Sequence, residues 1–169
     1  MKPRAWHFTQ DDERKLTEVR GVIAYLASKY HLTLPDLLTT LGQKDYLLPV
    51  GVFTAELSVL ETAAKYLKEH YQLNYHTIGE LLGRDERNIW HTCRLAQKKH
   101  PAALEAGESA YFIPVSIFAD RRYSALESLA RFMRDTLGLT YAEIAELLKR
   151  DQRTIWTVYK RSMTKDGQK

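Results

Sequence analysis

The sequence contains an internal duplication. Residues 58–99 align with residues 124–165 at an offset of 66 residues without a gap, and about sixteen of the aligned positions are identical. The identities run through the whole segment and include these pairs: Tyr75/Tyr141, Ile78/Ile144, Leu82/Leu148, Arg84/Arg150, Asp85/Asp151, Arg87/Arg153, Ile89/Ile155 and Trp90/Trp156. A match of this density indicates that one structural unit occurs twice in the chain.

Each copy begins with a predicted helix. In the second copy, apolar residues recur at spacings of three and four, as one face of a helix requires: Leu126, Leu129, Met133 and Leu137. Ser124 and Glu127 have the spacing of a capping box at its start, and Ser58 and Glu61 have the same spacing in the first copy. Gly138 is suited to the left-handed conformation that ends a helix.

Two shorter helices are predicted to follow. Thr140 and Glu143 form a further capping box, and Asp151 is well placed to cap the third helix after a tight turn at Lys149 and Arg150. The inward faces of these two helices are predicted to hold Ile144, Leu147, Leu148, Ile155, Tyr159 and Ser162. The first copy has the corresponding turn, cap and inward residues: Gly83-Arg84, Asp85, Ile89, Cys93 and Ala96.

Segments outside the two copies complete the expected architecture. Two apolar leaders, Leu47–Phe53 and Phe112–Phe118, carry a proline and β-branched residues, which favour extended arms that pair with each other or pack across the copies. Near the N-terminus, a helical stripe predicts one long helix: Leu16, Val19, Ile23, Leu26 and Tyr30. Residues 22–34, with Leu37, Leu41 and Gly42, resemble a decayed third copy that lacks its last helix.

We therefore expect an all-α protein built from four segments. Residues 1–48 form an N-terminal helical segment, interpreted as a degenerate repeat. Residues 49–100 form the first three-helix unit, and residues 112–165 form the second. Residues 101–111 form the linker, and the short extended arms lie between the helical units.

The composition excludes several classes of function. No apolar run approaches the roughly 20 residues of a membrane span, and residues 1–10 lack a signal-peptide pattern. The single cysteine, Cys93, permits no intrachain disulfide, so we expect a cytoplasmic protein. We find no phosphate-binding glycine loop, no nucleophile motif and no set of ligands at metal-binding spacing. We therefore predict no enzymatic activity, no cofactor and no metal.

The positive charge is concentrated in the second copy. The net charge of the chain is +4, and from Asp120 to Lys165 ten Lys or Arg residues stand against six Asp or Glu residues. A clustered excess of this kind suits a surface that faces phosphates. On charge alone, a solvated face of a helical domain remains the commoner explanation.

Two short helices joined by a tight turn are typical of the helix-turn-helix, whose second helix enters the major groove of DNA. Arg87 and Arg153 lie two residues past the cap of the third helix and are suited to a bidentate contact with guanine. The residues expected to contact base edges are Glu86, Arg87, Asn88 and His91 in one copy and Gln152, Arg153, Thr154 and Thr157 in the other. The residues expected to contact phosphates are Arg84, Arg94, Lys98, Arg150, Lys160 and Arg161.

Residues 140–156, TYAEIAELLKRDQRTIW, resemble the C-terminal helix-turn-helix of bacterial sigma factors (region 4), which reads a promoter element. The resemblance covers about twenty-five residues of each copy. It rests on an acidic residue, a small residue, a cap and a β-branched residue: Glu143, Ala145, Asp151 and Ile155. It implies that base-contacting positions fall on Glu86, Arg87 and His91 in the first copy and on Gln152, Arg153 and Thr157 in the second.

The sequence predicts a transcription regulator that binds double-stranded DNA through two recognition helices at a bipartite, asymmetric site. One alternative is an architectural protein that binds DNA without sequence preference. Another is a protein-interaction module that docks on RNA polymerase or self-associates through its arms. For Trp90 and Trp156, packing in the core or between the copies is at least as compatible with the pattern as a DNA contact.

Overall fold

The computed structural model describes residues 9–30, 45–105 and 109–166, and these residues are mostly helical. The chain divides into two compact units, Met1–Lys44 and Asp45–Lys169, and both copies of the duplication belong to the second unit. Among the described residues, no helix has the length and apolar character needed to span a bilayer.

The described part of the first unit is one long helix, α1 (Gln10–Tyr30), as predicted. It begins after Thr9, whose hydroxyl accepts from the N–H of Asp12 at 3.3 Å, while the carboxylate of Asp12 accepts from the N–H of Thr9 at 2.9 Å. Leu37, Leu41 and Gly42 lie outside the described residues, so the decayed third copy stays a prediction.

The first repeat, residues 58–99, forms three helices: α3 (Val59–Glu69), α4 (Tyr75–Leu82) and α5 (Glu86–Lys99). The predicted capping box is present, with the Ser58 N–H donating to the Glu61 carboxylate at 2.8 Å. Asp85 caps α5 by accepting from the N–H of Arg87 at 2.9 Å. The predicted inward residues Ile89, Cys93 and Ala96 are buried, and so are Ile78 and Leu82 of α4.

The second repeat, residues 124–165, forms α6 (Ala125–Arg131), a π-helical turn η3 (Phe132–Thr136), α7 (Tyr141–Leu147) and α8 (Gln152–Asp166). Its two capping boxes are confirmed at Ser124 and Thr140. Three features differ from the expectation. The first helix passes into a π turn, and Leu147 is half-buried. Tyr159 is also half-buried, and its hydroxyl donates to Asp135 at 2.8 Å.

The loops of the two repeats share one backbone conformation. The left-handed residues are Gln72 and Gly83 in the first repeat, and Gly138 and Lys149 occupy the equivalent positions in the second. Their φ values lie between 52° and 70°. The duplication therefore preserves the turn geometry even where the glycine itself is replaced.

The two arms pair with each other, which was one of the two predicted arrangements. β1 (Leu47–Pro49) and β2 (Phe112–Pro114) are antiparallel, with Leu48 opposite Ile113. The hydrogen bonds at the two ends of this pairing are equivalent. The Val50 N–H donates to the Tyr111 carbonyl at 3.0 Å, and the Val115 N–H donates to the Tyr46 carbonyl at 2.9 Å. The two-stranded sheet therefore has a local two-fold symmetry that exchanges the two arms. This two-stranded sheet adds a β element to the otherwise helical architecture that we predicted.

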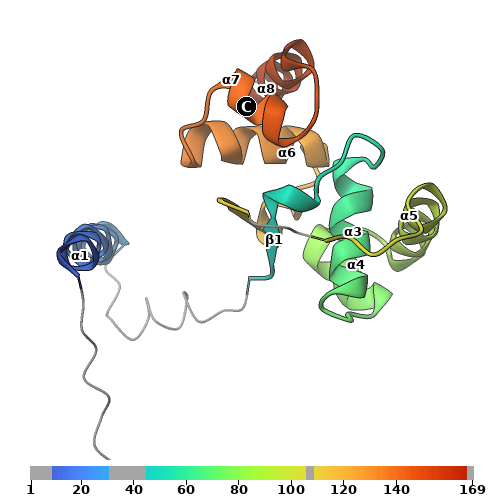
Figure 1. Ribbon diagram of the computed structural model, residues 1–169, viewed down its shortest axis with the longest axis horizontal. Coiled ribbons are helices and arrows are strands. Elements are labelled where there is room, and N and C mark those ends of the chain that lie inside the picture. The colour runs from blue at the N-terminus through green and yellow to red at the C-terminus, as the bar shows by residue number, and fades with distance from the viewer. Residues whose placement is uncertain (1–8, 31–44, 106–108, 167–169) are drawn as a thin grey trace, which may run out of the picture. The chain divides into compact units, whose positions relative to one another are not determined.

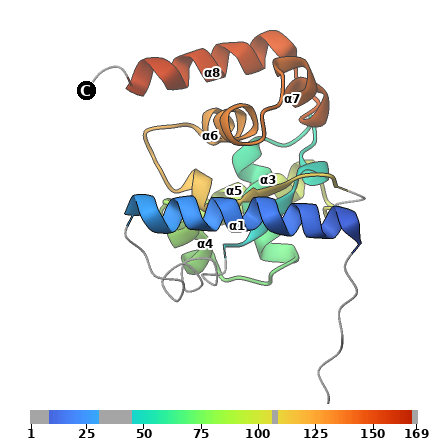
Figure 2. The ribbon, with the colours of Figure 1, turned by 90° about the vertical axis from the view of Figure 1, so that its left-hand side faces the viewer.

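Each strand of the two-stranded sheet leads into a short 3-10 turn, η1 (Val50–Val52) after β1 and η2 (Val115–Phe118) after β2. One hydrophobic core extends through both repeats. In two views, α6 lies between the α7–α8 pair and the first repeat (Figures 1 and 2). The first helices, α3 and α6, pack against each other. Because α5 packs on α3 and α8 packs on α6, each third helix is held by its own repeat.

Candidate nucleic-acid interface

The orientation of α5 and α8 is set by buried residues at helical spacing. Ile89, Cys93 and Ala96 anchor α5, while Ile155 and Ser162 anchor α8. These contacts turn the opposite face of each helix outward. Seven of the eight predicted base-contacting residues are exposed: Glu86, Arg87, Asn88, His91, Gln152, Arg153 and Thr154. The eighth, Thr157, is half-buried, and its hydroxyl donates to the carbonyl of Arg153 at 2.7 Å.

The C-terminal end of each third helix is tied to the first helix of its repeat. The ammonium group of Lys99 donates to the carboxylate of Glu61 at 2.7 Å, and that of Lys165 donates to the carboxylate of Glu127 at 2.6 Å. Burial by itself would raise the pKa of both carboxyl groups, but these bonds and those from the capped N–H groups outweigh it and hold each pKa below its usual value. The same ion pair is therefore present in both repeats.

The predicted phosphate-contacting residues fall into two groups. Four are exposed along α5 and α8: Arg94, Lys98, Lys160 and Arg161. Arg84 and Arg150 are half-buried and line a groove between the repeats together with residues of both. Arg150 donates to the carbonyl of Leu57 at 2.6 Å, so its guanidinium links the two repeats.

Both tryptophans are exposed, so neither packs in the core or between the repeats. The exposed fraction is 39% for Trp90 and 48% for Trp156. Each indole follows a core isoleucine by one residue, which turns it about 100° away from the buried face. A cation lies near each ring, with Arg94 at 5.2 Å from the Trp90 centroid and Lys160 at 6.0 Å from that of Trp156.

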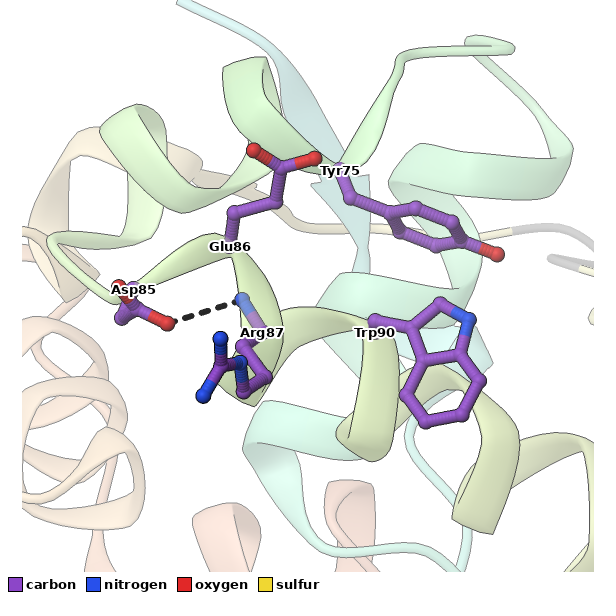
Figure 3. Close-up of a pocket in the computed structure, with 5 residues that line it drawn as sticks. All are labelled: Tyr75, Asp85, Glu86, Arg87 and Trp90. Atoms are coloured by element: carbon purple, nitrogen blue, oxygen red, sulfur yellow. Dashed lines mark hydrogen bonds between the residues drawn. The ribbon is translucent and has the colours of Figure 1, made fainter.

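Each tryptophan helps to line a shallow hollow at the start of its helix. The first hollow, of about 580 Å³, is bordered by Tyr75, Asp85, Glu86, Arg87 and Trp90, and the Tyr75 and Trp90 rings lie on the same side of α5 (Figure 3). The second, of about 650 Å³, is bordered by the equivalent residues: Tyr141, Asp151, Gln152, Arg153 and Trp156. Sequence reasoning did not assign the two tyrosines to this surface, although their identity in both repeats was a usable signal.

The two hollows differ in charge. In the first repeat, Glu86 lies 3.6 Å from His76, which also lies 3.5 Å from Glu80. The second repeat has Gln152 in place of Glu86 and Lys149 in place of Gly83. The second surface is therefore the more basic. Within the described part of the chain, no group of three or more His, Cys, Asp or Glu side chains is arranged to hold a metal ion.

No match was found in comparisons with protein-family models, with curated proteins or with solved structures. Function must be inferred from the chain's own surfaces. The duplication supplies an internal comparison for this purpose, because exposed residues that are identical in both repeats can be separated from exposed residues that differ.

Proposed function

We propose that the protein binds double-stranded DNA and that α4–α5 and α7–α8 act as two helix-turn-helix units. The observation that carries the proposal is the duplicated, exposed Arg and Trp pair in the first turns of α5 and α8. A forked guanidinium at the start of an outward-facing helix matches the O6 and N7 acceptors of guanine. The exposed lysines and arginines farther along both helices supply phosphate contacts.

The local two-fold symmetry of the two-stranded sheet formed by β1 and β2 supports a bipartite site with half-sites in opposite orientation. The proposed site has a guanine in each half, contacted by Arg87 and Arg153. The halves differ elsewhere, because Glu86, Asn88 and His91 are replaced by Gln152, Thr154 and Thr157. A protein that recognises such a site would act as a transcription regulator.

The test is selection of bound duplexes from a random pool at about 0.15 M salt. Wild type is compared with the double variant Arg87→Ala/Arg153→Ala. A matched control, Arg20→Ala/Arg121→Ala, removes the same charge from exposed positions outside α5 and α8. We expect wild type and the control to recover one two-part motif that the first variant loses. A single compact half-site would contradict the bipartite arrangement, and retained binding without a motif would indicate an architectural protein.

A protein partner, such as RNA polymerase, is the second candidate. It is favoured by the apolar side chains that α5 and α8 expose beside their charges: Trp90, Leu95, Trp156 and Met163. The salt dependence of binding distinguishes the two candidate functions. Binding to DNA through about six phosphates weakens steeply as salt rises, whereas an apolar protein interface responds little.

A further inference from the structure

Several of the residues that the two repeats share lie together on one surface feature of each repeat. Around the start of α5 and α8, the exposed arginine and tryptophan are identical, and so is the half-buried tyrosine at the start of α4 and α7. Their exposed neighbours at 86, 88 and 91 differ from those at 152, 154 and 157. Core packing does not require an indole at a position that is 39% or 48% exposed, so the retention of tryptophan in both copies indicates a contact common to both half-sites.

The position of the indole defines what it can meet on a duplex. Trp90 follows Arg87 by three residues, which places it about 4.5 Å farther along the helix and about 60° around it. That advance is close to one base step of about 3.4 Å. Trp90 lies on the flank of α5 that faces Tyr75, while Arg87 is nearer the centre of the outward face (Figure 3). Within a major groove, this flank faces the groove wall, where one strand's backbone runs.

The base edges at that wall offer one apolar group. Among the four base pairs, the major groove presents donors, acceptors and the C5-methyl of thymine, which sits on the outer side of the pyrimidine beside its own backbone. An indole placed against polar edges would desolvate them without replacing their hydrogen bonds. Arg94 lies over the Trp90 ring and Lys160 over the Trp156 ring. A cation at this position is suited to bind the phosphate of the nucleotide whose thymine methyl contacts the indole.

We propose that Trp90 and Trp156 each read the methyl group of a thymine one base step from the guanine contacted by Arg87 and Arg153. The inference rests on the proposed DNA binding and specifies it further. Both half-sites then share a guanine–thymine step, with Tyr75 and Tyr141 forming the outer wall of the methyl site. The remaining bases of the two halves differ, as the residues that face them do.

The experiment removes the methyl group alone. In the selected duplex, each thymine beside the shared guanine is replaced by deoxyuridine, one half-site at a time, and affinity is measured by fluorescence anisotropy with the full chain. We expect wild type to lose about three- to fivefold in affinity at each half-site, as burial of one methyl group implies. Trp90→Ala is expected to lose the response in its own half-site and to keep it in the other. Trp156→Ala is expected to show the reverse.

A matched control is Leu95→Ala, which removes an exposed apolar side chain from another side of α5 and is expected to leave both responses intact. Circular dichroism verifies that the variants are folded. If a specific duplex binds equally well with thymine and deoxyuridine, the methyl contact is wrong while DNA recognition stands. If the initial selection enriches no duplex, the proposed function fails and the inference fails with it.

Discussion

Arg150 of the second repeat donates a hydrogen bond to the main-chain carbonyl of Leu57 in the first repeat, at 2.6 Å. Its counterpart Arg84 is also followed by an aspartate but donates to the carbonyl of Gly83, within its own repeat, at 3.2 Å. One of two identical residues therefore bridges the repeats, while the other does not.

Replacement of Arg150 by alanine is expected to lower the free energy of unfolding by about 1–3 kcal/mol, because the Leu57 carbonyl loses a charged donor. Arg84→Ala is the control and is expected to change it by less than about 0.5 kcal/mol. Urea unfolding followed by circular dichroism measures both. Equal losses in the two variants would show that the bond between the repeats contributes nothing.

Gly83 is expected to tolerate alanine poorly. Its φ is +60°, and a Cβ at this position would collide with the carbonyl oxygen of Ala119. Gly138 has a φ of +70° but no atom within 4 Å of the corresponding Cβ position. We expect Gly138→Ala to cost about 1 kcal/mol, the conformational term alone, and Gly83→Ala to cost at least about 2 kcal/mol more. Similar losses at both positions would contradict the close approach of the Gly83 turn to Ala119.

Acid is expected to destabilise the protein through Glu61 and Glu127. Each buried carboxylate has a pKa held below its usual value of 4.5, because a lysine and the capped N–H outweigh the opposing effect of burial. A folded-state pKa below the unfolded one means that the stability is present above the unfolded pKa and is lost as pH falls through the folded value. The Tm is therefore expected to hold from pH 7 to about pH 5 and to fall below it.

The variant Glu61→Gln/Glu127→Gln is expected to have a lower Tm at pH 7 and a shallower fall in acid. Glu105→Gln, at an exposed position in the linker, is the control and is expected to follow wild type. The measurement is the Tm as a function of pH from 7 to 3. If the Tm of all three proteins falls in parallel as the pH is lowered, carboxylates other than Glu61 and Glu127 cause the acid response.

Cys93 is expected to react slowly in the folded protein. Burial raises the pKa of its thiol to about 11, from the ordinary 9.0. At pH 8 the thiolate fraction is then on the order of a hundredfold lower than in the unfolded chain. A thiol-specific disulfide reagent should modify the cysteine rapidly in 6 M guanidinium and at least about a hundredfold more slowly in its absence. Rapid modification without denaturant would place the thiol at the surface.

The sequence predicted the helices well because their signals are local. Ser58 and Glu61, three residues apart, meet across one turn, and Asp85 and Asp151 cap the next N–H groups whatever the rest of the chain does. The buried face of α5 followed from the three- and four-residue spacing of Ile89, Cys93 and Ala96.

The features that sequence reasoning missed depend on distant partners. Pairing of Leu48 with Ile113 joins residues 65 positions apart, and the pattern left it open whether the arms pair or pack elsewhere. The exposure of Trp90 depends on how α5 packs against α3, whose Lys65, Lys68 and Glu69 line a hollow beside the indole. The bridging role of Arg150 depends on how the repeats pack, which the sequence around Arg84 and Arg150 does not indicate.

The start of α5 carries a carboxylate that the start of α8 lacks. Glu86 is exposed and lies next to Arg87, whereas the second repeat has Gln152. Glu86→Gln removes a negative charge from the proposed DNA-facing surface, so we expect affinity for the selected duplex to rise about two- to tenfold at 0.05 M salt and the gain to shrink at 0.2 M salt. Preference at the facing base pair should shift from cytosine toward adenine, as glutamine presents both a donor and an acceptor. Glu105→Gln makes the same change in net charge outside this surface. Equal gains in the two variants would assign the effect to net charge and remove Glu86 from the interface.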